Sequence, residues 1–138
     1  MTEEFERQVM SGLLAGDDPM LAALRAQYEV ATVRDREKTA LGFVTRFEIP
    51  ESAAPIDRKL LHLDDLQVRL AGAATPAETS AHVHNGRLRS LECFVYSGSF
   101  PETPQITAAW YYGTAEFPGI TPELLAARDI EELLEDDE

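Results

Sequence analysis

The sequence has few of the residues that build disulfide frameworks, membrane spans or nucleic-acid interfaces. Its single cysteine, Cys93, excludes an internal disulfide and a cysteine-based zinc cluster. No apolar run approaches the roughly 18 residues that a membrane-spanning helix needs. Lysine and arginine number 12 against 25 aspartates and glutamates, and the net charge of −13 repels a phosphate backbone. We therefore expect neither a membrane nor a nucleic acid as a partner.

The remaining composition is that of a folded globular protein. Apolar residues make up 44% and charged residues 27% of the 138 residues, which predicts one domain spanning 1–138. The first six residues are acidic where a secretory signal peptide is basic, and no long apolar stretch follows them. Together with the single cysteine, this predicts a cytoplasmic location.

Hydrophobic periodicity predicts helices at both ends of the chain. Phe5, Val9 and Leu13 recur at helical spacing, and Asp18-Pro19 offers an N-cap and a first-turn proline for a second helix. Near the other end, Thr121 and Pro122 begin a third helical pattern in the same way. The expected segments are helical residues 1–29, a sheet over 30–112, a C-terminal helix over 121–134 and an acidic tail over 135–138.

Between the helices, apolar and polar residues alternate with the period of a β-strand. The clearest stretches are 41–47, 64–71 and 106–112. The gaps between them are too short for the crossover helices that parallel strands need. We therefore expect an α+β fold with a single antiparallel sheet of five to six strands. The N-terminal helices and the C-terminal helix pack on this sheet.

Asn85-Gly86 is the strongest turn signal in the chain and predicts a β-hairpin. Both positions of a type I′ turn need a positive φ, which glycine and asparagine adopt readily. The expected cross-strand pairs are His84 with Arg87, Val83 with Leu88, and His82 with Arg89. Strict alternation would place Ser90 on the core face with Leu88 and turn Leu91 to the opposite face, although Leu91 is apolar and Ser90 is not. A β-bulge near these two residues resolves this, placing Leu88, Leu91, Cys93 and Val95 on the core face.

Four polar residues of the hairpin gather on the face opposite the core: His82, His84, Arg87 and Arg89. Two imidazoles on one strand have the spacing of a metal site, but the neighbouring arginines oppose a metal ion. The same side chains suit an anion or a small anionic ligand. We therefore expect no metal here, and either an anion site or a solvated hairpin tip.

A second candidate set combines Glu92 and Tyr96 of the hairpin with Trp110 and Tyr112 of the aromatic strand. Aromatic residues anchor protein interfaces and also line small-ligand pockets. A carboxyl group buried among them gains a raised pKa and can act as a general acid. The sequence holds no nucleophile elbow, phosphate loop or dinucleotide fingerprint, so it predicts no catalytic residue and no cofactor.

Residues 85–96, NGRLRSLECFVY, resemble a signature of small uncharacterised bacterial α+β proteins. In those proteins an Asn-Gly or Asp-Gly turn is followed by a hydrophobic residue, then by Leu-Glu and an aromatic pair ending in Tyr. Some of them resemble immunity proteins of bacterial toxin systems. The resemblance implies a bacterial, cytosolic α+β protein.

Two functions are compatible with these features. The first is a non-enzymatic protein-binding module, similar to an immunity protein, that neutralises or scaffolds a basic partner. Its support is the net charge, since residues 116–138 alone hold nine acids and one base. The second is a small-ligand- or anion-binding domain, or a small enzyme, that uses the sheet face around the hairpin. A flat face with protruding aromatic residues favours the first function, and a deep pocket lined by them favours the second.

Overall fold

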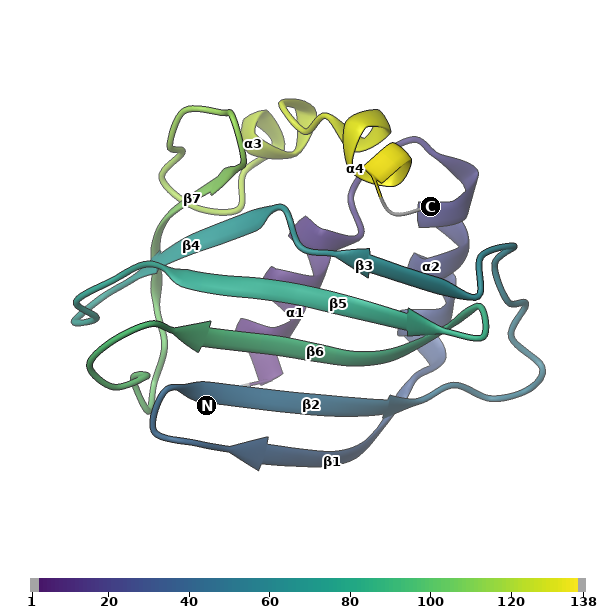
Figure 1. Ribbon diagram of the computed structural model, residues 1–138, viewed down its shortest axis with the longest axis horizontal. Helices are drawn as coiled ribbons and strands as arrows, with labels where there is room; N and C mark the ends of the chain where they lie inside the picture. The colour runs from purple at the N-terminus through teal and green to yellow at the C-terminus, as the bar shows by residue number, and fades with distance from the viewer. Residues whose placement is uncertain (1–2, 137–138) are drawn as a thin grey trace.

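The computed structural model describes residues 3–136, apart from the side chains of residues 132, 135 and 136. Two helices precede the strands and two short helices follow them (Figure 1). The N-terminal helices are α1 (Glu3–Leu13) and α2 (Pro19–Val30), and the last helices are α3 (Pro122–Ala126) and α4 (Ile130–Asp136). The strands are β1 (Thr32–Lys38), β2 (Gly42–Glu48), β3 (Leu60–Leu63), β4 (Leu66–Leu70), β5 (Ala77–His84), β6 (Arg87–Val95) and β7 (Ile106–Tyr111).

All the strands belong to one antiparallel sheet, in the order β1-β2-β6-β5-β4-β7, with β3 also paired to β5. The predicted α+β class and the antiparallel sheet are confirmed, but the described residues form seven strands rather than five to six. The sequence pattern misses β3, because four residues are too few to show alternation and their partners lie in β5. β4 pairs with one end of β5 and β3 with the other.

The helices α1 and α2 cover one face of the sheet, while no helix of the described residues 3–136 lies on the opposite face (Figure 1). The core lies between the sheet and these two helices, and α3 and α4 lie along the side where β3, β4 and β7 run. We call the face without helices the uncovered face.

The two N-terminal helices form as their sequence predicts. Phe5, Val9 and Leu13 are all buried on one side of α1. The Asp18 carboxylate caps α2 by accepting a hydrogen bond from the backbone N–H of Met20 at 2.8 Å, with Pro19 in the first turn. Within residues 3–136 no helix has both the length and the apolar character needed to cross a lipid bilayer.

The charged run from Arg34 to Lys38 forms most of the edge strand β1, and every residue of this strand is exposed. Charges along an edge strand oppose pairing with a further strand, so this sequence protects the edge of the sheet. Arg36 also fastens the strand to α1, because its guanidinium donates two hydrogen bonds to the buried Glu6 carboxylate, at 2.8 and 2.9 Å. Glu6 also accepts a hydrogen bond from Thr45 of β2.

The central hairpin has the predicted turn. Asn85 and Gly86 have φ values of 53° and 78°, and His84 pairs with Arg87. The bulge lies earlier than predicted, at Arg89, so His82 pairs with Ser90 and not with Arg89. The expected consequence still holds: Leu88, Leu91, Cys93 and Val95 are buried together, while Glu92 and Phe94 face the other way.

The position of the bulge follows from a buried side chain of α2. The amide of Gln27 is fully buried and accepts a hydrogen bond from the N–H of Leu88 at 2.9 Å. It also donates to the carbonyl groups of Gly86 and Ala54, at 3.0 and 2.9 Å. This amide therefore satisfies the buried backbone N–H of Leu88 beside the bulge, where the β-ladder is interrupted.

The expected C-terminal helix over 121–134 is instead two short helices, and this corrects the prediction. The break falls between α3 and α4, where Arg128 turns into the interior of the protein. A single continuous helix would follow the apolar pattern, but the polar contacts of Arg128 fix the chain at the break. α4 extends to Asp136, and residues 137–138 of the expected acidic tail lie outside the described residues.

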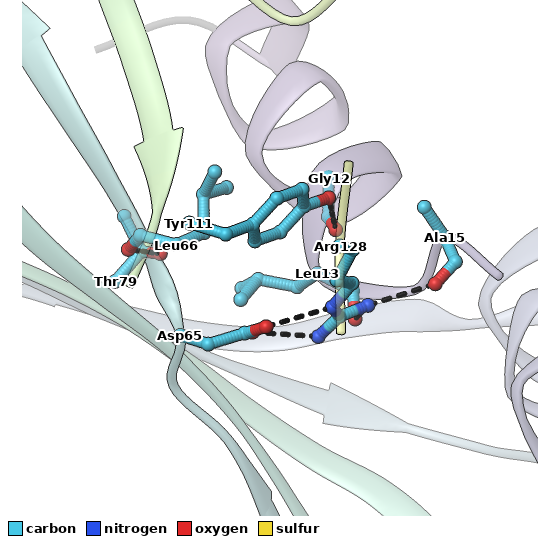
Figure 2. Close-up of polar contacts among 8 residues, drawn as sticks. All are labelled: Gly12, Leu13, Ala15, Asp65, Leu66, Thr79, Tyr111 and Arg128. Carbon is cyan, nitrogen blue, oxygen red and sulfur yellow. Dashed lines mark hydrogen bonds and ion pairs between the residues drawn. The ribbon is translucent and has the colours of Figure 1, made fainter. Parts of the chain in front are cut away.

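Arg128 joins the C-terminal segment to two other parts of the fold (Figure 2). Its guanidinium forms a bidentate pair with the Asp65 carboxylate, at 2.7 and 2.9 Å. It also donates to the carbonyl groups of Leu13 and Ala15, both at 2.8 Å, at the end of α1. The two charged side chains are only 1% and 9% exposed, so this is a buried ion pair, and each guanidinium nitrogen has a hydrogen-bond acceptor.

Tyr111 completes this buried group. Its ring lies 5.1 Å from the Arg128 guanidinium, and its hydroxyl donates to the carbonyl of Gly12 at 2.5 Å (Figure 2). Burial raises the pKa of Tyr111 to about 12. The residues of this group therefore hold the last helices, the sheet and α1 together, which is a structural role.

We expect the thiol of Cys93 to be unreactive in the folded protein. The residue is fully buried on the core face of β6, and burial raises the pKa of its thiol well above the ordinary value. Reaction with a disulfide reagent should be about a thousandfold slower in buffer than in guanidinium chloride, since it requires unfolding. Rapid reaction of the native protein would place the thiol at the surface and contradict this packing.

Candidate functional site

The alternation along β5 decides which side chains reach the uncovered face. Ala77, Thr79, Ala81 and Val83 are buried against the helices, so the residues between them point away. Residues that pair across neighbouring strands lie on the same face of the sheet. The pairing of the strands therefore shows which residues of the other strands share the uncovered face with those of β5. The resulting rows on the uncovered face are Asp35-Arg46-Ser90-His82-His62, Glu37-Val44-Glu92-Ser80 and Phe94-Glu78-Gln67-Trp110.

His82 lies among three polar neighbours near the middle of this face. Its Nε2 is 3.0 Å from the hydroxyl of Ser80 and 3.3 Å from the Glu92 carboxylate. Its ring meets that of His62 edge to face, with the ring centres 4.6 Å apart. The Glu92 side chain is 42% exposed, so it does not have the buried setting that makes a carboxyl group a general acid.

The other members of the predicted anion cluster have contacts of their own. Arg89 lies beside His84, with 3.0 Å between Nη1 and Nδ1. Arg87 instead donates to the carbonyl groups of Glu51 and Ala53, at 3.3 and 3.2 Å, and so holds the loop before β3. The structure therefore brings His84 and Arg89 together but does not direct all four side chains at one anion.

The second predicted set lies at the other end of the uncovered face, except for Glu92. Tyr96 and Tyr112 are among the most exposed large hydrophobic residues of the described chain, at 70% and 55%. Phe94 lies against Tyr96, with the ring centres 5.2 Å apart at 85°. We call the set of Glu78, Phe94, Tyr96, Trp110 and Tyr112 the aromatic patch. Its two tyrosines protrude from the face.

A chain of hydrogen bonds orders this patch across three strands. The Trp110 indole donates to Gln67 at 2.7 Å, and the Gln67 amide donates to the Glu78 carboxylate. The Tyr112 hydroxyl donates to the same carboxylate at 2.7 Å. Partial burial raises the pKa of Tyr112, and the hydrogen bond to Glu78 acts in the same direction. The Glu78 carboxylate is thus held in a fixed orientation.

A cation already lies on this part of the face. The guanidinium carbon of Arg69 is 5.3 Å from the centre of the Trp110 ring. The same guanidinium forms an ion pair with Glu116 at 2.7 Å. An aromatic ring and a carboxylate therefore share one guanidinium beside the patch, a combination that is energetically favourable.

Of the predicted site residues, Glu92 borders a small hollow of the surface. A depression of about 190 Å³ at Val44, Glu92 and Phe94 is smaller than the pockets that enclose drug-sized ligands. A larger hollow of about 720 Å³ lies between the β1–β2 turn and residues 99–103, and none of the predicted site residues lines it. Within the part of the chain that the structure describes, no group of three His, Cys, Asp or Glu residues is arranged to hold a metal ion.

The predicted site residues do not include His62, Gln67, Glu78 and Phe94, which the structure places in the site. The period of two along residues 77–84 could have identified Glu78, because it shares the face of His82 and His84. His62 and Gln67 lie in the site because β3 and β4 pair with β5, and no local sequence pattern predicts this pairing.

Comparisons of this chain with models of protein families, with curated proteins and with solved structures find no match.

Proposed function

We propose that this chain is a non-enzymatic protein-binding module that binds a basic partner through the uncovered face. The observation that carries the proposal is the aromatic patch, where Tyr96 and Tyr112 protrude beside the Glu78 carboxylate. Exposed tyrosines that are already ordered by their neighbours contribute strongly to protein interfaces, because little conformational entropy is lost on binding. The resemblance of residues 85–96 extends the proposal to an immunity protein that neutralises its partner.

The charge of the molecule supports a basic partner. At a net charge of −13, the long-range field attracts positively charged proteins and accelerates their association. Salt weakens this steering, because the Debye length falls from about 10 Å at 0.1 M to about 3 Å at 1 M. The association rate should therefore fall as the ionic strength rises.

The arrangement of His82 argues against acyl-transfer chemistry on this face. In a catalytic triad the serine and the carboxylate contact different nitrogen atoms of the histidine. Here the Ser80 hydroxyl and the Glu92 carboxylate both approach Nε2. The carboxylate therefore competes with the serine for one nitrogen and does not orient the imidazole as a general base. This geometry favours a binding role over a hydrolytic one.

The test is affinity capture of partners at low and high salt, followed by measurement of their binding to variants. The variant Tyr96→Ser/Tyr112→Ser should lose about 2 kcal/mol or more of binding free energy, about 30-fold in affinity. The matched control replaces Val30 and Leu41 with serine, since these residues are also exposed and lie outside the patch. It should retain the affinity of the unmodified protein.

Two results would contradict the proposal. One is a captured protein whose affinity does not change in the Tyr96→Ser/Tyr112→Ser variant. The other is a purified protein that carries a stoichiometric small molecule and captures no basic protein at low salt, which would favour a ligand-binding domain or an enzyme.

A further inference from the structure

The Glu78 carboxylate of the aromatic patch is hydrogen-bonded to neutral groups. The two hydrogen bonds that orient its carboxylate come from the Tyr112 hydroxyl and the Gln67 amide, which are both neutral groups. A carboxylate has about four acceptor positions, so two neutral donors leave room for further hydrogen bonds. Glu78 is therefore suited to accept a hydrogen bond from a cation of a partner.

Aromatic rings stand on both sides of this carboxylate. Phe94 is the cross-strand partner of Glu78 on β6, and Tyr96 packs against Phe94. Tyr112 follows β7 and lies at hydrogen-bond distance from Glu78 on the other side. The faces of tyrosine rings attract cations, and a carboxylate beside them adds the opposite charge.

The cation that fits this combination best is a guanidinium. It is planar and stacks on aromatic rings, and its N–H groups can form a two-pronged hydrogen bond with a carboxylate. The neighbouring Arg69 contacts both a ring and a carboxylate within the protein, because its guanidinium lies over the ring of Trp110 and donates one hydrogen bond to Glu116. This intramolecular pair shows that the uncovered face accommodates a guanidinium between a ring and a carboxylate.

We propose that the aromatic patch is a binding site for one arginine side chain of the partner protein. The guanidinium stacks against Tyr96 and Tyr112 and donates hydrogen bonds to Glu78. This inference rests on the proposed protein-binding function and specifies the chemistry that the partner must present. Lysine binds the same site more weakly, because its ammonium group neither stacks nor forms the two-pronged hydrogen bond.

The proposal is tested with a set of short peptides that differ at one position, followed by NMR titration of the full chain. The peptide acetyl-Gly-Ser-Arg-Ser-Gly-amide is compared with the same peptide carrying lysine or citrulline in place of arginine. Citrulline keeps the planar shape and removes the charge. The arginine peptide should shift the signals of Tyr96, Trp110 and Tyr112, and the citrulline peptide should not.

Variants of the protein identify which side chains bind the arginine peptide. Glu78→Gln should weaken the arginine peptide about tenfold, because it removes a charge-assisted hydrogen bond. Glu48→Gln removes an equal charge from an exposed position at the end of β2 and should change the affinity by less than about twofold. Tyr96→Leu should weaken binding about two- to fivefold, and the exposure of Tyr96 makes this variant harmless to the fold.

Equal binding of the arginine and citrulline peptides would overturn the inference, as would equal effects of Glu78→Gln and Glu48→Gln. Failure of the arginine peptide to bind would overturn it as well, even if the captured partner depends on the patch. Conversely, peptide binding that requires Glu78 supports the arginine site even if affinity capture finds no partner, and only the protein-binding function then fails.

Discussion

Replacement of Arg128 with methionine should lower the free energy of unfolding by about 3–5 kcal/mol. Methionine fills much of the same space but leaves the carboxylate of Asp65 buried without its partner. The carbonyl groups of Leu13 and Ala15 also lose their donor. Buried groups that lose a partner carry the full cost of their removal from water, which explains the large effect. Urea denaturation followed by circular dichroism measures the change.

Arg69→Met is the matched control for this variant. Arg69 also pairs with a carboxylate at 2.7 Å, but the two side chains are 46% and 53% exposed. Its loss should cost about 1 kcal/mol or less. The double variant Asp65→Leu/Arg128→Met should recover part of the stability, because no isolated charge remains. A loss below about 1 kcal/mol for Arg128→Met alone would show that the pair does not hold the C-terminal helices.

Replacement of Gly86 with alanine should destabilise the protein by about 2–4 kcal/mol. Gly86 has a φ of 78°, which is strained for alanine, and an added Cβ would lie 2.6 Å from the carbonyl oxygen of Ile56. The backbone of Ile56 is itself hydrogen-bonded to Gly86, so it cannot move away without losing that bond. The backbone strain of the positive φ and the steric clash of the added Cβ therefore both contribute to the loss of stability at this position.

Gly72→Ala separates the two effects. Gly72 has a similar φ of 80°, but an added Cβ there meets no atom within 4 Å. Only the backbone strain remains, and the cost should be about 1–2 kcal/mol. The difference between the two variants in thermal or chemical denaturation measures the close packing of the turn against the loop before β3. Equal losses of stability in the two variants would mean that the loop at Ile56 moves to accommodate the added Cβ, and that its close packing against Gly86 does not contribute to stability.

The parts of the fold that follow local rules are those that the sequence predicts. Asp18 and Pro19 begin α2, and Asn85 and Gly86 close the hairpin, because each needs only its chain neighbours. The position of the bulge depends on Gln27, about sixty residues away, which no alternation within the hairpin reports. In the same way, the break between α3 and α4 depends on the pairing of Arg128 with Asp65.

In the candidate site, too, features set by neighbouring residues are predictable from the sequence and features set by distant residues are not. The exposure of Tyr96 and Tyr112 matches the alternative in which aromatic residues protrude from the face. The cluster built on His82 and Arg89 rested on a register that the bulge shifts by one residue, so these two side chains are not cross-strand partners. Glu78, which orders the patch, has an unremarkable local sequence, and its role comes from Tyr112 across the sheet.

The central claim is that the uncovered face, through its aromatic patch, contacts a partner. Hydroxyl-radical footprinting of the complex with a captured partner tests this claim most directly, since it reports the exposure of individual side chains. Tyr96 and Tyr112 should be oxidised several-fold more slowly in the complex than in the free protein, while Tyr28 on the helical side should be oxidised at the same rate. Protection of Tyr28 with unchanged oxidation of Tyr96 and Tyr112 would place the partner on the helices and contradict the account.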